Sequence, residues 1–236
     1  MSIAGTRLRI VTFAAAAALG LVDVAGPRPA AALPDLLPEI FDLAVAVRDV
    51  LQGDVDEGCA GGRYDRRLVR YSLRTHNIGQ DDLILGSPGC PNCSLNPGAH
   101  CTNPLFHCGT AHGHAHFEYF AKNQILDGDD NVVVEGQKYG FCLLDQGGCP
   151  TPQYSCSYQG ITAGCSDVYA AGLPCQYVDI TDAGLPDGDY RLRVTLDPDN
   201  HFAESNEANN VIEVPFAIGA TPRVCPVYPA ADVPQV

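Results

Sequence analysis

Hydrophobic and polar positions alternate with a period of two along three stretches of the chain, residues 69–76, 191–196 and 212–218. This period is typical of a strand with one buried face, so each stretch is predicted to be a half-buried strand. Pro215 falls on the outer face of the third stretch. Because proline cannot donate a hydrogen bond to a neighbouring strand, it predicts that this strand lies at a sheet edge.

Between Glu39 and Leu51 the apolar residues recur at a helical spacing instead. They are Ile40, Leu43, Ala44, Val47, Val50 and Leu51. We expect one short amphipathic helix here, ending near Gly53.

Turn signals separate the periodic stretches, and glycine-, proline- and cysteine-rich connections cover residues 86–109 and 147–174. Turn chemistry is favoured over calcium loops for the acidic turns, which are Gly128-Asp129-Asp130-Asn131, Asp187-Gly188-Asp189 and Asp197-Pro198-Asp199-Asn200. The predicted fold is mainly β: one disulfide-braced β-sandwich over residues 33–236, with long irregular loops and the short N-terminal helix.

Residues 1–32 are predicted to be a secretory signal peptide. Two arginines precede an apolar run from Ile10 to Val22, and Ala30-Ala31-Ala32 supplies small residues for cleavage. The run is too short for a membrane span, and no later segment qualifies. We therefore expect a secreted protein, extracellular or periplasmic, without a membrane span.

The chain carries a formal net charge of −14, and loss of residues 1–32 would leave about −16. Such acidity disfavours nucleic acid as a partner and attracts a protonated amine or a basic protein. A role in solubility alone is an open alternative.

Eleven cysteines in an exported chain predict several disulfides, and their odd number leaves at least one without an intrachain partner. The close pairs Cys142 with Cys149 and Cys165 with Cys175 could close short loops. Cys90-Pro-Asn-Cys93 has redox spacing, but no βαβ pattern surrounds it, so a structural disulfide is favoured.

Three histidines, His112, His114 and His116, stand at alternate positions. On a strand they would share one face, and Gly113 and Ala115 would leave the opposite face clear, so the imidazoles could converge on one ion. Neutral imidazole suits copper and zinc. The alternative is three histidines on a solvated strand.

Four segments in order resemble the catalytic domain of lysyl oxidases. They are His112-x-His114-x-His116, residues 135–143, residues 164–169 and residues 175–182. The resemblance is sharpest from Cys108 to Asp182 and thinner from Pro34 to about Cys225. It indicates a secreted form of microbial type, without the animal propeptide.

The resemblance implies copper on the three histidines and a lysine tyrosylquinone cofactor made from Lys138 and Tyr169. It assigns Asp167 as the base that removes a proton from the substrate carbon bearing nitrogen. The expected activity is oxidation of primary amines, including peptidyl lysine in basic proteins, to aldehydes, with O2 giving hydrogen peroxide and ammonia.

Some positions depart from the family pattern. The resemblance suggests a Cys108–Cys156 disulfide, and Cys59 and Cys225 stand alone where animal members have pairs, so these two could bridge each other. A histidine of animal members is replaced by Lys122 or a neighbour.

Two further segments resemble those that hold calcium in family structures. The candidate ligands are Asp35, the Leu36 carbonyl, Glu204, Asn206, Asn209 and Asn210. An Asx-rich turn without an ion is equally open. Two other functions compete with the oxidase: a non-catalytic extracellular calcium-binding β-sandwich module, and a zinc hydrolase with three histidine ligands.

Overall fold

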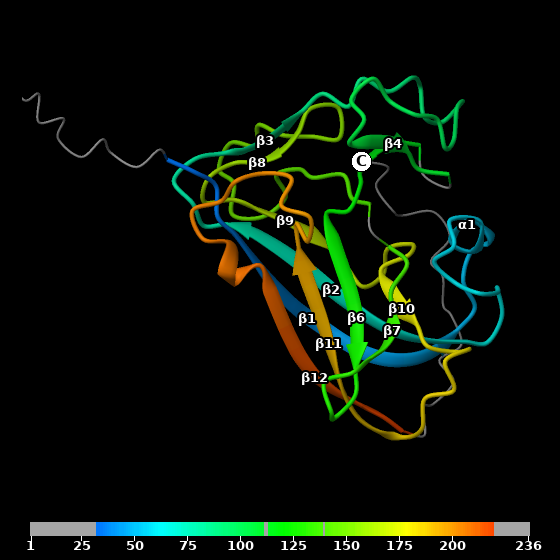
Figure 1. Cartoon of the computed structure of the whole chain (residues 1–236). Coiled ribbons are helices and arrows are strands. Elements are labelled where there is room, and N and C mark those ends of the chain that lie inside the picture. Colours follow the sequence, from blue (N-terminus) through cyan, green and yellow to red (C-terminus); the bar gives the residue numbers. More distant parts are fainter. Residues whose placement is uncertain (1–31, 111–112, 139, 220–236) are drawn as a thin grey trace, which may run out of the picture. The chain divides into compact units, whose positions relative to one another are not determined.

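Two four-stranded antiparallel sheets face each other in the computed structural model, which describes residues 32–110, 113–138 and 140–219. In the first sheet β2 (Arg66–Asn77) pairs with β1 (Leu36–Arg48), β10 (Tyr177–Asp179) and β9 (Ser166–Tyr169). The second sheet has the order β12 (Val211–Ile218), β11 (Gly188–Leu196), β6 (Ala121–Leu126) and β7 (Val132–Glu135). Figure 1 shows β6 and β11 crossing in front of β1 and β2.

Short elements lie beside these sheets. Two small two-stranded antiparallel sheets pair β3 (Leu83–Gly86) with β8 (Gln159–Ile161), and β4 (Phe106–Cys108) with β5 (Ala115–Phe117). β3 and β8 lie side by side in the upper part of Figure 1, and β4 lies to their right. Two short helices complete the described part of the chain: α1 (Gln52–Asp56) and the 3-10 helix η1 (Glu207–Asn209).

The predicted mainly β, disulfide-braced sandwich is confirmed. Val69, Tyr71 and Leu73 of β2 enter the same core as Leu192 and Val194 of β11, as their alternation predicts. Pro215 is exposed on β12, which is an edge strand as expected. The core between the two sheets therefore forms from strands that the alternation of hydrophobic and polar residues predicted.

The helix predicted for residues 39–51 is wrong, because this segment forms most of β1. Ile40 packs on the core before the bulge, whereas Leu43 and Val45 pack on it afterwards. The core-facing positions therefore change from even to odd residue numbers along β1. The register against β2 shifts between Phe41 and Ala44, and Asp42 has a φ of 52°. Such a bulge moves the buried face by one residue, so two strand segments imitate a helical spacing. The short helix of this region is α1, which follows at Gln52.

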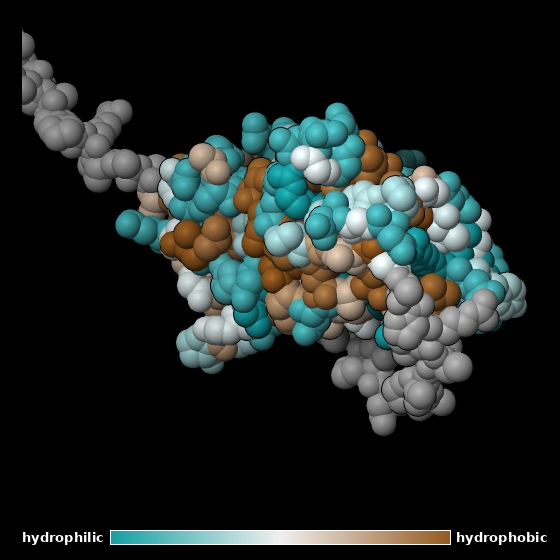
Figure 2. All heavy atoms as spheres, turned by 90° about the horizontal axis from the view of Figure 1, so that it is seen from below, coloured by the Kyte–Doolittle hydropathy of each residue, from teal (hydrophilic) through white to brown (hydrophobic). Residues whose placement is uncertain are grey.

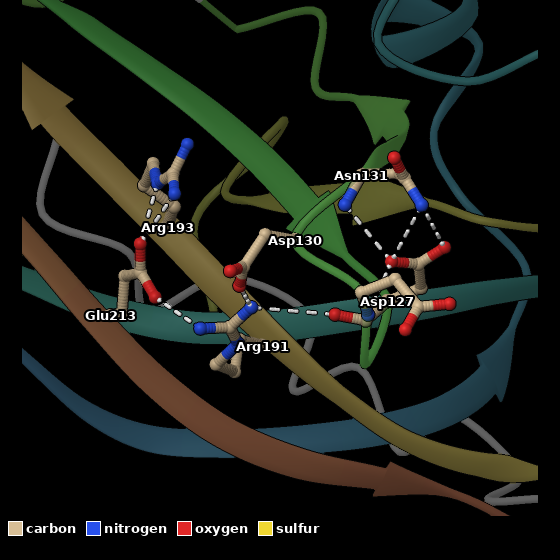
Figure 3. Close-up of polar contacts among 7 residues, drawn as sticks. Asp127, Asp130, Asn131, Arg191, Arg193 and Glu213 are labelled. Carbon is tan, nitrogen blue, oxygen red and sulfur yellow. Dashed lines mark hydrogen bonds and ion pairs between the residues drawn. The ribbon is translucent and has the colours of Figure 1, made fainter.

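The acidic turn between β6 and β7 satisfies its carboxylates with protein donors, as turn chemistry predicts (Figure 3). One Asp127 oxygen accepts hydrogen bonds from the backbone N–H groups of Asp129 and Asn131, both at 2.9 Å. Arg191 of β11 contacts the Asp130 carboxylate and the Asp127 carbonyl. These contacts explain the turn without a bound ion.

Five disulfides brace the loops in the described part of the chain, and their pairing corrects every specific pair that the sequence suggested. They are Cys59–Cys175, Cys90–Cys101, Cys93–Cys108, Cys142–Cys156 and Cys149–Cys165. Cys142–Cys149, Cys165–Cys175, Cys108–Cys156, Cys59–Cys225 and a bridge within Cys90-Pro-Asn-Cys93 are all excluded. Spacing along the chain fails here because disulfide geometry depends on the distance between Cα atoms in the fold.

Some predictions fall on segments outside the described residues. The proposed signal peptide does so apart from Ala32, and so does Cys225. In the described part of the chain, no helix has both the length and the apolar character needed to cross a membrane. Hydrophobic and hydrophilic residues are interspersed on the face shown in Figure 2.

Truncation of Leu73 tests the core between the sheets. Leu73 is fully buried, so Leu73→Ala should lower the free energy of unfolding by about 2–5 kcal/mol. Leu95 is 77% exposed, and Leu95→Ala should change it by about 0.5 kcal/mol at most. Urea unfolding of both variants measures the difference, and equal losses would contradict the assigned burial.

Candidate functional site

Two of the predicted copper ligands converge. Nε2 of His114 lies 3.1 Å from Nε2 of His116. One ion bound to two imidazoles through bonds of about 2.0–2.1 Å produces a nitrogen separation of this size. The strand is shorter than expected, since β5 begins at Ala115, and His112 lies outside the described residues.

The face opposite the histidines is covered at Ala115, where the expectation of a clear face is wrong, whereas Gly113 is exposed. A Cβ atom on Gly113 would lie 2.5 Å from Oγ of Ser94. Ala115 is buried against the disulfide-bonded Cys93 and Cys108. The cysteine-rich loop therefore covers this face at Ala115.

A fourth histidine, which the sequence reasoning missed, lies opposite His116. His107 of β4 is its register partner on β5, and the two ring centroids are 5.7 Å apart. Nδ1 of His107 lies 2.6 Å from Oε1 of Glu118. The strand pairing that brings His107 here joins only three residues on each side, too few for an alternation pattern to predict it.

Lys138 lies on the loop after β7 and directs its ammonium group toward two aromatic rings. Nζ is 5.0 Å from the ring centroid of Phe141 and 5.6 Å from that of Tyr169. Burial lowers the pKa of Lys138 to about 8, against the opposing field of nearby carboxylates, the largest that of Glu57. A larger fraction of this amine is therefore neutral, and nucleophilic, near neutral pH than for an exposed lysine.

Tyr169 and Asp167 share one face of β9, two residues apart. They pair with Leu73 and Thr75 of β2, which fixes both backbones on the first sheet. The Tyr169 hydroxyl donates to the Cys142 carbonyl and also hydrogen-bonds with Asp167. Burial raises the pKa of the phenol, so it stays protonated in this environment.

Asp167 is fully buried. Burial raises the pKa of its carboxyl to about 8, although hydrogen bonds from the Leu144 and Val168 N–H groups favour the ionised form. A carboxyl with a pKa in this range can exchange a proton near neutral pH, as a general base must.

A backbone bridge joins the histidine strand to the lysine and tyrosine. Phe117 and Phe141 exchange two hydrogen bonds, 2.6 Å from the Phe117 N–H and 3.0 Å from the Phe141 N–H. The Phe141 ring meets the Tyr169 ring edge to face at 4.6 Å. His116 and Lys138 are thereby tied to one rigid aromatic cluster.

A cavity of about 280 Å³ opens on the side of His116 and Lys138. Its wall includes His107, His116 and Lys138. Three carboxylates also line it, from Asp56, Glu57 and Glu118. The lining therefore favours a cationic ligand.

The calcium candidates Asp35 and Glu204 lie in a separate polar cluster. One oxygen of Asp35 accepts from Nδ2 of Asn209 at 2.7 Å, and Oε1 of Glu204 accepts from Nδ2 of Asn210 at 2.7 Å. The Leu36 N–H donates to Glu204. Burial raises the pKa of Glu204 to about 7.

Two amide oxygens in this cluster are buried without a hydrogen bond from any described residue. They are Oδ1 of Asn209 and Oδ1 of Asn210. Asn206 differs, since its Oδ1 accepts from the Ala208 N–H at 3.2 Å and caps η1. Buried unsatisfied acceptors beside carboxylates fit a hard cation such as calcium.

The family model described as lysyl oxidase matches residues 53–222. The chain belongs to the lysyl oxidase family. It is 37% identical to lysyl oxidase homolog 2 of Gallus gallus over 154 residues, which covers 63% of this chain and 18% of that protein. It is 31% identical to lysyl oxidase homolog 2B of Danio rerio over 199 residues, covering 76% and 24%.

Similarity to lysyl oxidase homolog 4 of Mus musculus is 36% over 153 residues, covering 62% of this chain and 18% of that protein. The chain thus spans about a fifth of the length of these relatives. Among solved structures, the CARDB domain of a Pyrococcus furiosus protein gives a TM-score of 0.31 at 14% identity, covering 78% of this chain and 88% of that one, which is too low to support an argument.

The resemblance to lysyl oxidases placed a replaced histidine at Lys122 or a neighbour. Lys122 and the next residue, Asn123, make different contacts. Lys122 forms an ion pair with Glu135, Nζ to Oε2 at 3.2 Å. Asn123 is buried, and its Nδ2 donates to the Lys138 carbonyl at 3.0 Å. Sequence reasoning passed over Asn123, although its position on β6 between the buried Ala121 and Ile125 places it on the inner face.

Proposed function

We propose that this lysyl oxidase family member is a copper- and quinone-dependent amine oxidase. It converts primary amines, including the side chain of peptidyl lysine, to aldehydes and releases hydrogen peroxide and ammonia. One observation carries the proposal: Nζ of Lys138 faces the ring of Tyr169 at 5.6 Å, next to a cavity whose wall includes His116.

The donor set fits copper. Two imidazole nitrogens 3.1 Å apart suit a borderline metal such as copper, and His112 would supply the third ligand. Bound copper would allow O2 to oxidise the Tyr169 phenol. His107 orients toward Glu118 and supports the ligand His116 from across the β4–β5 ladder.

The pair of Lys138 and Tyr169 fits the lysine tyrosylquinone. Lysine carries four methylene groups, so Nζ can cover the remaining few ångströms to a ring carbon by rotation of its side chain. Phe141 packs against the Tyr169 ring and holds its plane. The quinone, once formed, would supply an electrophilic carbonyl for a substrate amine.

Asp167 is the proposed general base. It lies two residues before Tyr169 on the same face of β9 and hydrogen-bonds with the Tyr169 hydroxyl. A carboxylate there would lie within reach of a substrate bound at the tyrosine ring. Its buried position excludes bulk water from the proton transfer.

The cavity favours a protonated amine as substrate. Asp56, Glu57 and Glu118 would attract the ammonium group and other positive charges near it. Conversion of the Lys138 amine into a quinone substituent would remove a positive charge from this wall. A basic protein is therefore a suitable polymeric substrate, with O2 as the second reactant.

Two other functions are less well supported. A zinc hydrolase would use the histidines, and a calcium-binding module would use the cluster at Glu204. Neither accounts for a lysine with a lowered pKa directed at a half-buried tyrosine ring. Calcium remains part of the proposal as a structural ion at Asp35, the Leu36 carbonyl, Glu204 and the asparagines 206, 209 and 210.

Export completes the proposal. Five disulfides in the described residues fit an oxidising compartment, extracellular or periplasmic. Residues 1–32 would act as the signal peptide, and the catalytic domain would begin at residue 33.

The quinone test uses metal-free protein loaded with copper in air. The wild type should develop a visible quinone band and then release peroxide from a primary amine, whereas Lys138→Ala and Tyr169→Phe should do neither. Lys122→Ala serves as the matched control, because Lys122 pairs with Glu135 and should leave the band unchanged. A colourless wild-type protein with full copper would refute the proposed function.

Turnover per quinone should rise with pH through about 8. The pKa of Asp167 is raised, so the carboxyl is protonated below this value and gains its basic form above it. Asp167→Asn should form the quinone yet lower turnover by about 10²–10⁴-fold and lose this pH limb. Asp129→Asn, in the exposed turn, is the control; full turnover of Asp167→Asn would remove Asp167 from the reaction.

Calcium should stabilise the protein, and more strongly as pH rises through about 7. Because the pKa of Glu204 is raised, its carboxyl carries a proton in the folded protein below this pH. Calcium must displace that proton in order to bind, so binding weakens as the pH falls. At about a hundred times its dissociation constant calcium should add about 2.7 kcal/mol, measured as a rise in Tm. Glu204→Gln should lose this response and Glu213→Gln keep it; an unchanged response in Glu204→Gln would exclude the site.

A further inference from the structure

The loop that carries Lys138 is held by one side chain of the neighbouring strand. Nδ2 of Asn123 donates to the Lys138 carbonyl at 3.0 Å, across fifteen residues of sequence. The main-chain oxygen of the same Asn123 accepts from the Gly136 N–H at 2.7 Å. Asn123 therefore anchors both the start of this loop and the lysine itself.

The loop has little freedom to shift at its start. A Cβ atom on Gly136 would lie 3.1 Å from Cβ of Asn123 and 3.1 Å from Cγ2 of Val178. Gly136 thus packs directly against β6 and β10. With this end fixed, the hydrogen bond from Asn123 sets where the Lys138 backbone lies, together with the Phe117–Phe141 bridge at the other end of the loop.

An amide at position 123 needs an explanation, because the inner face of β6 is otherwise apolar. Asn123 is 1% exposed between Ala121 and Ile125, both fully buried. Its Oδ1 is buried and accepts no hydrogen bond from any described residue. A half-satisfied buried amide costs free energy that an apolar side chain of similar size would avoid. The bond to Lys138 is the interaction that the amide uniquely provides.

We propose that Asn123 is a positioning residue for cofactor formation, which holds Lys138 so that its amine reaches the ring of Tyr169. The inference rests on the proposed function. The lysine comes from the loop after β7 of the second sheet and the tyrosine from β9 of the first. Before the crosslink exists, only non-covalent contacts keep these groups together; afterwards the covalent bond does so.

The crosslinking reaction consumes two molecules of O2. One provides the new ring oxygen and leaves its second atom as water; the other leaves as hydrogen peroxide. Oxygenation replaces one ring C–H bond by a C–O bond, and the phenol loses its O–H hydrogen as the quinone forms. A second ring C–H bond and one N–H bond of Lys138 give way to the C–N bond. These four hydrogens and six electrons pass to the two O2 molecules, which yield the ring oxygen, water and hydrogen peroxide. Asn123 takes no part in these transfers. Misplacement of the lysine slows the C–N bond formation, since a shift near 1 Å costs up to about 10²-fold in rate.

The test compares formation of the quinone with its use. Two variants, Asn123→Ala and Asn123→Leu, are prepared metal-free and loaded with copper in air. Their side chains differ in size, so that misfolding of one variant leaves the other to test the inference. Copper content and thermal melting are measured first. The quinone band should then appear about tenfold more slowly or worse, while peroxide release per quinone should stay within about twofold of the wild type.

Asn77→Ala is the matched control. Asn77 is also 1% exposed, and its Nδ2 donates to the backbone carbonyls of Asp81 and Ile161, both at 2.9 Å. This variant loses those two bonds, and the two that Oδ1 accepts from the Asp35 and Gly79 N–H groups, away from the lysine loop. It should therefore form quinone at the wild-type rate even if its Tm falls.

Four outcomes would overturn the inference. The first is quinone formation at the wild-type rate in both folded Asn123 variants, and the second is equally slow quinone formation in Asn77→Ala. The third is a loss of turnover per quinone in the Asn123 variants without slower quinone formation. The fourth is a loss of copper from the Asn123 variants that accounts for their slower quinone formation. The first three leave the proposed oxidase intact when the wild type forms its quinone. Absence of quinone in the wild type itself would refute both proposals together.

Discussion

The backbone bridge between Phe117 and Phe141 is the contact on which the candidate site depends. It ties β5, which carries His116, to the loop segment that follows Lys138. The Phe141 ring then meets Tyr169, the last residue of β9. Three segments far apart in the chain therefore share one aromatic cluster. Buried aromatic rings resist displacement, so the positions of the reactive groups follow from packing rather than from flexible loops.

Desolvation shapes the chemistry of this cluster. It lowers the pKa of Lys138 and raises that of Asp167, each to about 8. Near neutral pH, the lysine is thus partly present as the neutral amine and the aspartate as the neutral carboxylic acid, forms that are scarce for the same groups in water. An amine that is partly neutral can act as a nucleophile, and a carboxyl that titrates there can accept a proton. The same burial therefore serves both the proposed assembly of the cofactor and its proposed use.

Disulfides take the place of regular structure around the site. The covering of the histidine strand comes from the loop held by Cys93–Cys108, and Cys142–Cys156 starts next to Phe141. Cys59–Cys175 joins the segment after α1 to the loop before β10, and Cys59 lines the cavity. Long connections with few strands lose much conformational entropy on folding, and crosslinks reduce that loss. This explains how irregular loops can present a fixed set of side chains.

The sequence by itself determined the strands β2, β11 and β12, the edge position of Pro215 and the family, because alternation and motif order are local properties of the chain. It also named Lys138 and Tyr169 through their motifs. Only the tertiary structure decided that residues 39–48 form a bulged strand, which cysteines pair, that His107 faces His116, and that Asn123 holds the Lys138 backbone. Each of these depends on which segments meet in space, and no local period encodes the distance between residues that are far apart in the chain.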